Sequence, residues 1–133
     1  MSLYVDTSAL LKRYVAEHDS DLAEELMAAD PVLVTSRLTE IEIRQNLTRL
    51  LHPDEAARAK SQFLKDLDAL HMVSLDVVIV SEAARIAEQT LCRSLDALHL
   101  ASAFRTGPAT TLLTFDNRQA QAARSLGLTV IGA

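Results

Sequence analysis

Residues 3–10 read LYVDTSAL and predict a strand that passes directly into a helix. Residues 3–5 form a short apolar run of β-prone side chains. Residues 6–8 (Asp-Thr-Ser) then offer the short, oxygen-bearing side chains that cap a helix, which we expect over residues 9–15. This part of the chain is therefore predicted to be a strand followed at once by a helix.

The same alternation of short apolar strands and helices continues along the chain. Breaks at residues 30–31 (Asp-Pro), 52–54 (His-Pro-Asp) and 107–108 (Gly-Pro) separate the segments. Strands that are apolar on both faces and alternate with helices indicate an α/β fold with a mainly parallel central sheet flanked by helices. Further strands are expected at residues 32–35, 72–75, 111–115 and 128–131, and further helices at residues 20–29, 39–51, 55–70, 81–92, 94–105 and 117–126.

The length and composition indicate one globular domain over residues 1–133. The single cysteine, Cys92, leaves no internal disulfide and no cysteine zinc cluster, which is typical of a reducing compartment. No run of about 18 uncharged apolar residues is present, so we expect no membrane segment. These features predict a soluble, cytoplasmic protein.

The charge balance is acidic, with 13 Lys and Arg against 18 Asp and Glu and a formal net charge of −5. Affinity for phosphate is largely electrostatic, so this balance disfavours indiscriminate binding to nucleic acid. It leaves room for a nucleic-acid enzyme whose acidic site carries its own metal cations.

Four carboxylates stand at the ends of predicted elements. Asp6 follows the first strand and Asp116 follows the strand at residues 111–115, so both should emerge at the same edge of a parallel sheet. Two like charges at one edge repel, and a divalent cation such as Mg²⁺ or Mn²⁺ makes their proximity favourable. Asp96 and Glu42 lie in the first turns of two predicted helices.

Helix capping is the alternative explanation for each of these carboxylates. Asp6 and Asp116 can be N-caps, Asp96 can complement a helix dipole, and Glu42 can form a capping box with Thr39, each stabilising by roughly 1 kcal/mol. Capping does not explain why two aspartates directly follow strands. The spacing alone leaves both explanations open.

Four segments in a fixed order resemble the PIN-domain ribonucleases, and within them the VapC-type toxins of bacterial toxin–antitoxin pairs. The order and spacing of the segments span residues 3–131, and SLDALHLASA is the most specific match. The segments are LYVDTSAL (residues 3–10), SRLTEIEIR (36–44), SLDALHLASA (94–103) and LTFDN (113–117).

The resemblance implies a PIN-like three-layer α/β fold and a metal-dependent endoribonuclease. In that family an acidic site holds one or two Mg²⁺ or Mn²⁺ ions, which activate water and relieve charge during phosphodiester hydrolysis. Neighbouring polar side chains would orient the ligands or cap the adjoining helix. The ligands implied are Asp6, Glu42, Asp96 and Asp116, and the neighbouring candidates are Thr7, Ser8, Thr114 and Asn117.

The second segment contains two glutamates, Glu40 and Glu42, of which one can readily enter the site. Two residues along a helix point about 160° apart. The apolar residues Ile43 and Leu47 lie nearer Glu40, which predicts that Glu40 is the more buried. The family register favours Glu42, so Glu42 is taken as the site residue with Glu40 as its substitute.

Two further features bear on the site. Arg118 stands two places after Asp116, where many PIN proteins carry another acidic residue, so the number of ions stays open between one and two. Arg118 and Arg93 are among the cations near the site that can contact an RNA backbone. His99 lies three residues after Asp96 and can face the same cleft, although a buried structural histidine is the more common case.

By resemblance, the partners are an RNA substrate and a cognate antitoxin whose Arg or Lys enters the acidic site, and the chain forms a homodimer. One alternative is a PIN-fold RNA-processing nuclease without an antitoxin. Another is a catalytically silent PIN-like module that binds proteins. A dinucleotide-binding or phosphatase-like domain is disfavoured because three glycines form no glycine-rich phosphate loop.

Overall fold

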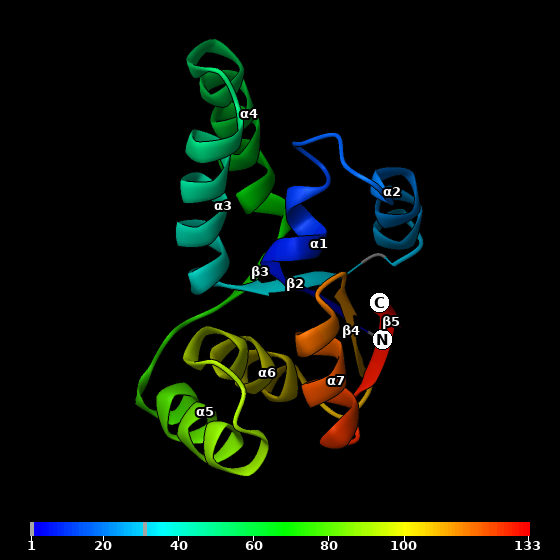
Figure 1. Cartoon of the computed structure of the whole chain (residues 1–133), viewed down its shortest axis with the longest axis vertical. Coiled ribbons are helices and arrows are strands. Elements are labelled where there is room, and N and C mark those ends of the chain that lie inside the picture. Colours follow the sequence, from blue (N-terminus) through cyan, green and yellow to red (C-terminus); the bar gives the residue numbers. More distant parts are fainter. Residues whose placement is uncertain (1, 31) are drawn as a thin grey trace.

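Five short strands form one wholly parallel sheet in the computed structural model, which describes residues 2–30 and 32–133 (Figure 1). The strand order is β3-β2-β1-β4-β5, which places β1 and β4 side by side in the middle. The expected mainly parallel sheet is therefore confirmed. The strands are β1 (Ser2–Val5), β2 (Leu33–Ser36), β3 (His71–Val73), β4 (Thr110–Thr114) and β5 (Thr129–Gly132).

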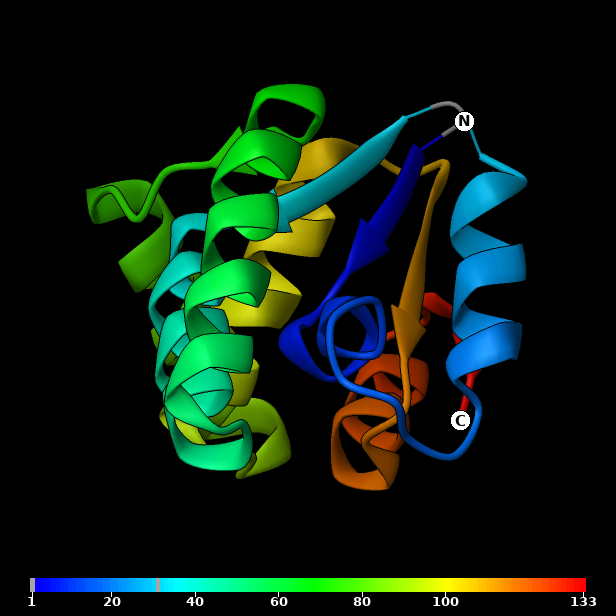
Figure 2. The same cartoon turned by 90° about the horizontal axis from the view of Figure 1, so that it is seen from above.

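Helices cover both faces of the sheet and make three layers. Figure 1 shows the first four helices above the sheet and the last three below it, and Figure 2 shows α3 beside α4 with α2 at the other edge. No helix in the described ranges is long and apolar enough to cross a bilayer. The helices are α1 (Thr7–Leu11), α2 (Ser20–Ala28), α3 (Arg37–Leu50), α4 (Pro53–Asp66), α5 (Val77–Thr90), α6 (Ser94–Thr106) and α7 (Asn117–Ser125), with a short 3₁₀ turn, η1 (Leu67–Ala69), after α4.

Two hydrophobic cores lie on opposite faces of the sheet. Tyr4 and Leu112 point toward α5, α6 and α7, whereas Val5 and Leu113 point toward α1 to α4. All four side chains are fully buried. This alternation follows from the two-residue repeat of a strand, and it explains why the strands are apolar on both faces.

Two helices begin earlier than predicted because a side chain caps them upstream. The helix expected from residue 39 begins at Arg37, since Ser36 Oγ accepts a hydrogen bond from the Leu38 amide at 3.0 Å. The helix expected from residue 81 begins at Val77, where Asp76 accepts from the Ile79 amide at 2.9 Å. Both caps follow the usual preference for Ser and Asp.

The predicted capping box between Thr39 and Glu42 is wrong. Thr39 is buried, and its hydroxyl lies 2.7 Å from that of Thr35. The helix starts two residues before Thr39, so Thr39 is not at the cap and Glu42 is free for another role. The predicted break at residues 30–31 falls partly on Pro31, outside the described residues.

Replacing either core leucine of β4 should be costly. Leu112→Ala and Leu113→Ala should each lower the free energy of unfolding by about 2–5 kcal/mol, because each leaves a cavity in a different core. Urea unfolding measures this, with Leu64→Ala on the exposed side of α4 as a control that changes stability by no more than about 0.5 kcal/mol. If either core variant cost no more than the control, one face of the sheet would be uncovered and the three-layer arrangement would be wrong.

Candidate functional site

A pocket of about 160 Å³ opens at the carboxyl ends of β1 and β4. All four predicted carboxylates line it, and they come from four separate parts of the chain. Of the four neighbouring candidates, Thr7 and Ser8 also line the pocket, Thr114 is buried behind it, and Asn117 is exposed outside it. The lining residues are Asp6, Thr7, Ser8, Glu42, Arg93, Leu95, Asp96, His99 and Asp116.

Asp6 is a buried carboxylate held by three hydrogen bonds. It caps α1 by accepting from the Ala9 amide at 3.1 Å, and it accepts from Ser8 Oγ at 2.7 Å and Thr114 Oγ1 at 2.5 Å. Burial raises the pKa of Asp6, and the hydrogen bonds offset only part of this effect. Capping and a place in the pocket are thus combined in one side chain.

Glu42 is fixed by a chain of polar contacts that begins at β1. The Tyr4 hydroxyl lies 2.8 Å from His99 Nδ1, and His99 Nε2 lies 2.7 Å from Glu42 Oε1. Thr7 Oγ1 donates to the same glutamate oxygen at 2.6 Å. These contacts fit a neutral His99 with its proton on Nε2, because Nδ1 can then accept from Tyr4.

The same contacts determine the charge of Glu42. Partial burial raises the pKa of Glu42, but the hydrogen bonds with His99 and Thr7 outweigh burial and hold the pKa below its usual value. Burial also raises the pKa of Tyr4, which keeps its hydroxyl protonated and able to donate. Glu42 therefore presents an ionised carboxylate to the pocket.

Glu40 lies outside the pocket and pairs with Arg37 at 3.0 Å. Its side chain is 30% exposed, against 21% for Glu42. The prediction that Glu40 is the more buried glutamate is therefore wrong. Glu42 is drawn inward by Thr7 and His99, two polar contacts that the apolar face of the helix does not reveal.

Arg93 joins the other two carboxylates at the mouth of the pocket. Its Nε lies 3.0 Å from Asp96 Oδ2 and its Nη2 lies 3.3 Å from Asp116 Oδ2. Asp96 is buried on the first turn of α6, and Asp116 caps α7 through the amides of Arg118 and Gln119. The guanidinium thus neutralises two like charges that would otherwise repel.

The donor set suits a hard divalent cation. Four carboxylates offer only oxygen ligands, which is the preference of Mg²⁺ and Mn²⁺. Within residues 2–30 and 32–133, no three Asp, Glu, His or Cys side chains are gathered closely enough to hold an ion as they stand. Arg93 accounts for this, because it sits between Asp96 and Asp116, and a bound ion would have to replace it at one or both.

Sequence reasoning underestimated two side chains of the site, His99 and Arg93. Both lie three residues from Asp96, one on each side, so all three share one face of the helix start. That spacing was the available signal. The contact that places His99 joins residues 95 positions apart, from Tyr4 to His99, and no local pattern shows it.

The sequence of this chain is similar to a described family and to named proteins. Residues 3–125 match the model of the PIN domain. The chain is 39% identical over 134 residues to Ribonuclease VapC35 of Mycobacterium tuberculosis, covering 97% of this chain and 95% of that protein. It is 33% identical to Ribonuclease VapC46 of the same species, covering 98% and 96%.

Solved structures with low sequence identity share the fold. FitAcB from Neisseria gonorrhoeae superposes with a TM-score of 0.78 at 16% identity, over 98% of this chain and 96% of that chain. VapBC-5 from Mycobacterium tuberculosis, described as a member of the VapBC family of toxin–antitoxin systems, gives a TM-score of 0.69 at 18% identity, over 99% and 98%. Both agree with the parallel, three-layer arrangement.

Removing the hydroxyl of Thr114 should destabilise the protein by leaving a buried carboxylate oxygen of Asp6 without its donor. Thr114→Val should lower the free energy of unfolding by about 1–3 kcal/mol, the cost of an unsatisfied buried polar group. Thr114→Ser keeps the hydroxyl and should recover most of the loss. Urea unfolding of both variants measures the effect.

Thr111→Val is the matched control on the same strand, because the Thr111 hydroxyl forms no hydrogen bond within the described residues. It should change stability by no more than about 0.5 kcal/mol. Equal losses at positions 111 and 114 would show that Thr114 contributes only as a strand residue.

Proposed function

This chain belongs to the PIN-domain family, and we propose that it is a VapC-type endoribonuclease that requires Mg²⁺ or Mn²⁺. One observation carries the proposal: four carboxylates from separate elements line a single pocket at the carboxyl edge of the sheet. The similarity to Ribonuclease VapC35 at 39% identity over 97% of the chain supports the same activity.

Asp6, Glu42, Asp96 and Asp116 are the residues that would hold one or two ions. A bound divalent ion supplies Lewis-acid chemistry, activating water near neutral pH and neutralising charge on the phosphoryl oxygens. The protein needs no histidine or serine nucleophile for this reaction. Arg118 stands where an additional acidic ligand would favour a second ion, so one firmly held ion is the simpler assignment.

The chain's own side chains prepare the site for a phosphodiester. Thr7 and His99 fix one oxygen of Glu42 and keep the carboxylate ionised. Ser8 and Thr114 hold Asp6 in a single orientation. Such neighbours of metal ligands tune affinity and activity by about 10- to 100-fold in other sites.

Arg93 has a second role in this proposal. Among the described residues that line the pocket, it is the sole cation. Its guanidinium is half-exposed and presents several donors, which match the oxygens of a phosphate. Release of Asp96 and Asp116 to a metal ion would leave this guanidinium available to the substrate.

We also propose that the protein is the toxin of a toxin–antitoxin pair, acting in the cytoplasm and restrained by an antitoxin. The proteins of the VapBC-5 structure carry that description, and they share this fold. An antitoxin Arg or Lys entering the pocket would compete with metal for the carboxylates, as Arg93 already does within the chain. A homodimer is proposed on the same family grounds.

Cleavage of RNA should depend on both the metal and Asp96. Purified, partner-free protein is incubated with a panel of structured RNAs in Mg²⁺, Mn²⁺ or EDTA, beside Asp96→Asn. We expect cleavage with metal and none with EDTA. Because the variant removes a ligand charge with little change of shape, its rate should fall by at least about 100-fold.

Cleavage in EDTA, or full activity of the variant, would contradict the proposal. If no RNA is cut, a calorimetric titration with Mn²⁺ decides between two explanations. Binding of Mn²⁺ without cleavage would mean that the substrate is missing from the panel. Absence of both would favour the catalytically silent module.

Glu42 should matter far more than Glu40. Glu42→Gln should lower cleavage by at least about 100-fold because it removes a direct ligand, an effect larger than the loss of a supporting contact. Glu40→Gln is the matched control, since it makes the same change two residues away on the same helix and outside the pocket. The reverse order of the two rates would show that the wrong glutamate has been assigned.

A further inference from the structure

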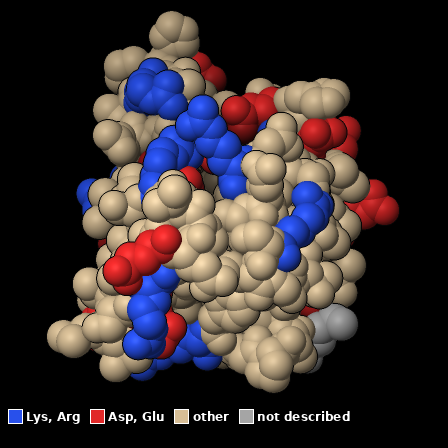
Figure 3. Space-filling view, turned by 60° about the horizontal axis from the view of Figure 1, so that its bottom comes forward, with Lys and Arg blue, Asp and Glu red and all other residues tan. Residues whose placement is uncertain are grey.

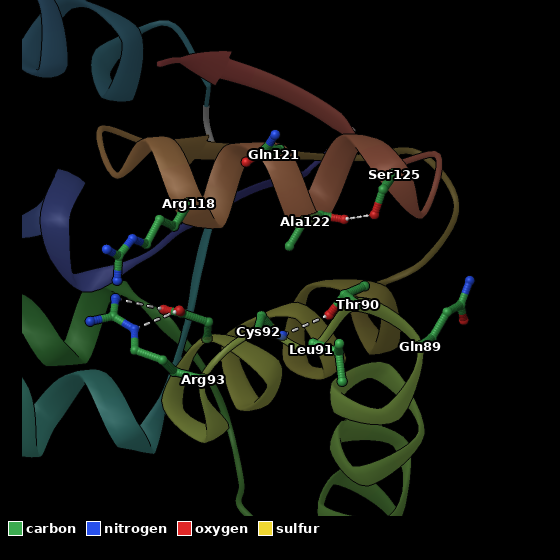
Figure 4. A pocket seen from close by; sticks show the side chains of 10 residues that line it. Gln89, Thr90, Leu91, Cys92, Arg93, Arg118, Gln121, Ala122 and Ser125 are labelled. Carbon is green, nitrogen blue, oxygen red and sulfur yellow. Dashed lines mark hydrogen bonds and ion pairs between the residues drawn. The ribbon is translucent and has the colours of Figure 1, made fainter.

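A second, larger groove adjoins the acidic pocket. It has a volume of about 540 Å³ and lies between the end of α5, the start of α6 and α7 (Figure 4). It shares Arg93 and Asp96 with the pocket, so the two form one continuous depression. We call it the Arg118 groove; it is lined by Gln89, Thr90, Leu91, Cys92, Arg93, Asp96, Arg118, Gln121, Ala122 and Ser125.

Two guanidinium groups stand where the groove meets the pocket. Figure 4 shows Arg118 extending from α7 toward Arg93. Arg93 is paired with Asp96 and Asp116, whereas Arg118 is exposed and forms no ion pair with any described residue. Two cations on the same groove repel each other, and an anion between them would relieve that repulsion.

The surrounding surface and the groove's lining favour RNA as the source of that anion. Despite the net charge of −5, several Lys and Arg side chains gather in the upper half of the face seen in Figure 3. The lining also carries the amides of Gln89 and Gln121 and the hydroxyls of Thr90 and Ser125. Amides and hydroxyls hydrogen-bond to ribose and to base edges, and no aromatic side chain lines the groove for stacking.

We propose that the Arg118 groove holds the RNA strand next to the phosphate that is cut, with Arg118 contacting a backbone phosphate. This inference rests on the proposed nuclease function and assigns where its substrate runs. The groove volume lies within the range of about 300–1,000 Å³ that encloses small ligands. Because Arg118 contacts backbone rather than bases, it contributes affinity without sequence preference.

Steady-state cleavage of a panel RNA that the wild-type protein cuts tests the assignment. Arg118→Gln should raise KM about tenfold and leave kcat within twofold, because a phosphate contact outside the acidic pocket contributes to binding rather than to the chemical step. The slope of log(kcat/KM) against log[KCl] should become shallower by about 0.7, the value for one phosphate contact on single-stranded RNA. Arg118→Lys keeps the charge and should recover part of the KM.

Arg58→Gln is the matched control, because it removes the same charge from an exposed arginine on α4, away from both depressions. It should leave KM, kcat and the salt slope unchanged. If wild-type protein cuts RNA and Arg118→Gln behaves like Arg58→Gln, the assignment is overturned while the nuclease function stands. If wild-type protein cuts no RNA in the panel and binds no Mn²⁺, the proposed function fails and this inference fails with it.

Discussion

Burying a carboxylate is unfavourable unless hydrogen bonds or a cation compensate, and Asp6 is buried at the junction of the two central strands. The Ala9 amide and the hydroxyls of Ser8 and Thr114 supply the hydrogen bonds. These donors tie β1 and β4 to the start of α1, so the sheet edge and the pocket are built from the same contacts. The remaining deficit in the stability of a charged Asp6 is the physical reason for a cation to bind beside it.

The site balances two states of charge. Four carboxylates meet at one edge, and Arg93 neutralises two of them through Asp96 and Asp116. Glu42 is kept ionised through a different route, the buried chain from Tyr4 through His99. The pocket is thus compatible with folding in the absence of an ion, while its all-oxygen donor set remains suited to one. A guanidinium already held between carboxylates also shows how a cation from a partner can occupy the same place.

The sequence predicts part of this arrangement because part of it follows from local rules. Asp6 and Asp116 could be placed together because each directly follows a strand of a parallel sheet. Glu42 could be separated from Glu40 only by the family register, because Thr7 lies 35 residues away and His99 lies 57 residues away. The helix starts at Arg37 and Val77 were missed because Ser36 and Asp76 cap from positions that were assigned to strand or loop. Arg93 belongs to the same class of omission, since its bridge to Asp116 depends on how α6 and α7 meet.

Crystals soaked in Mn²⁺ would test the central claim most directly, because anomalous scattering locates the ion independently of activity. The account predicts an anomalous peak within the pocket lined by Asp6, Glu42, Asp96 and Asp116, together with movement of the Arg93 guanidinium away from Asp96 or Asp116. A peak elsewhere, or none in the pocket at Mn²⁺ concentrations that support cleavage, would contradict the assignment of these carboxylates as the metal site.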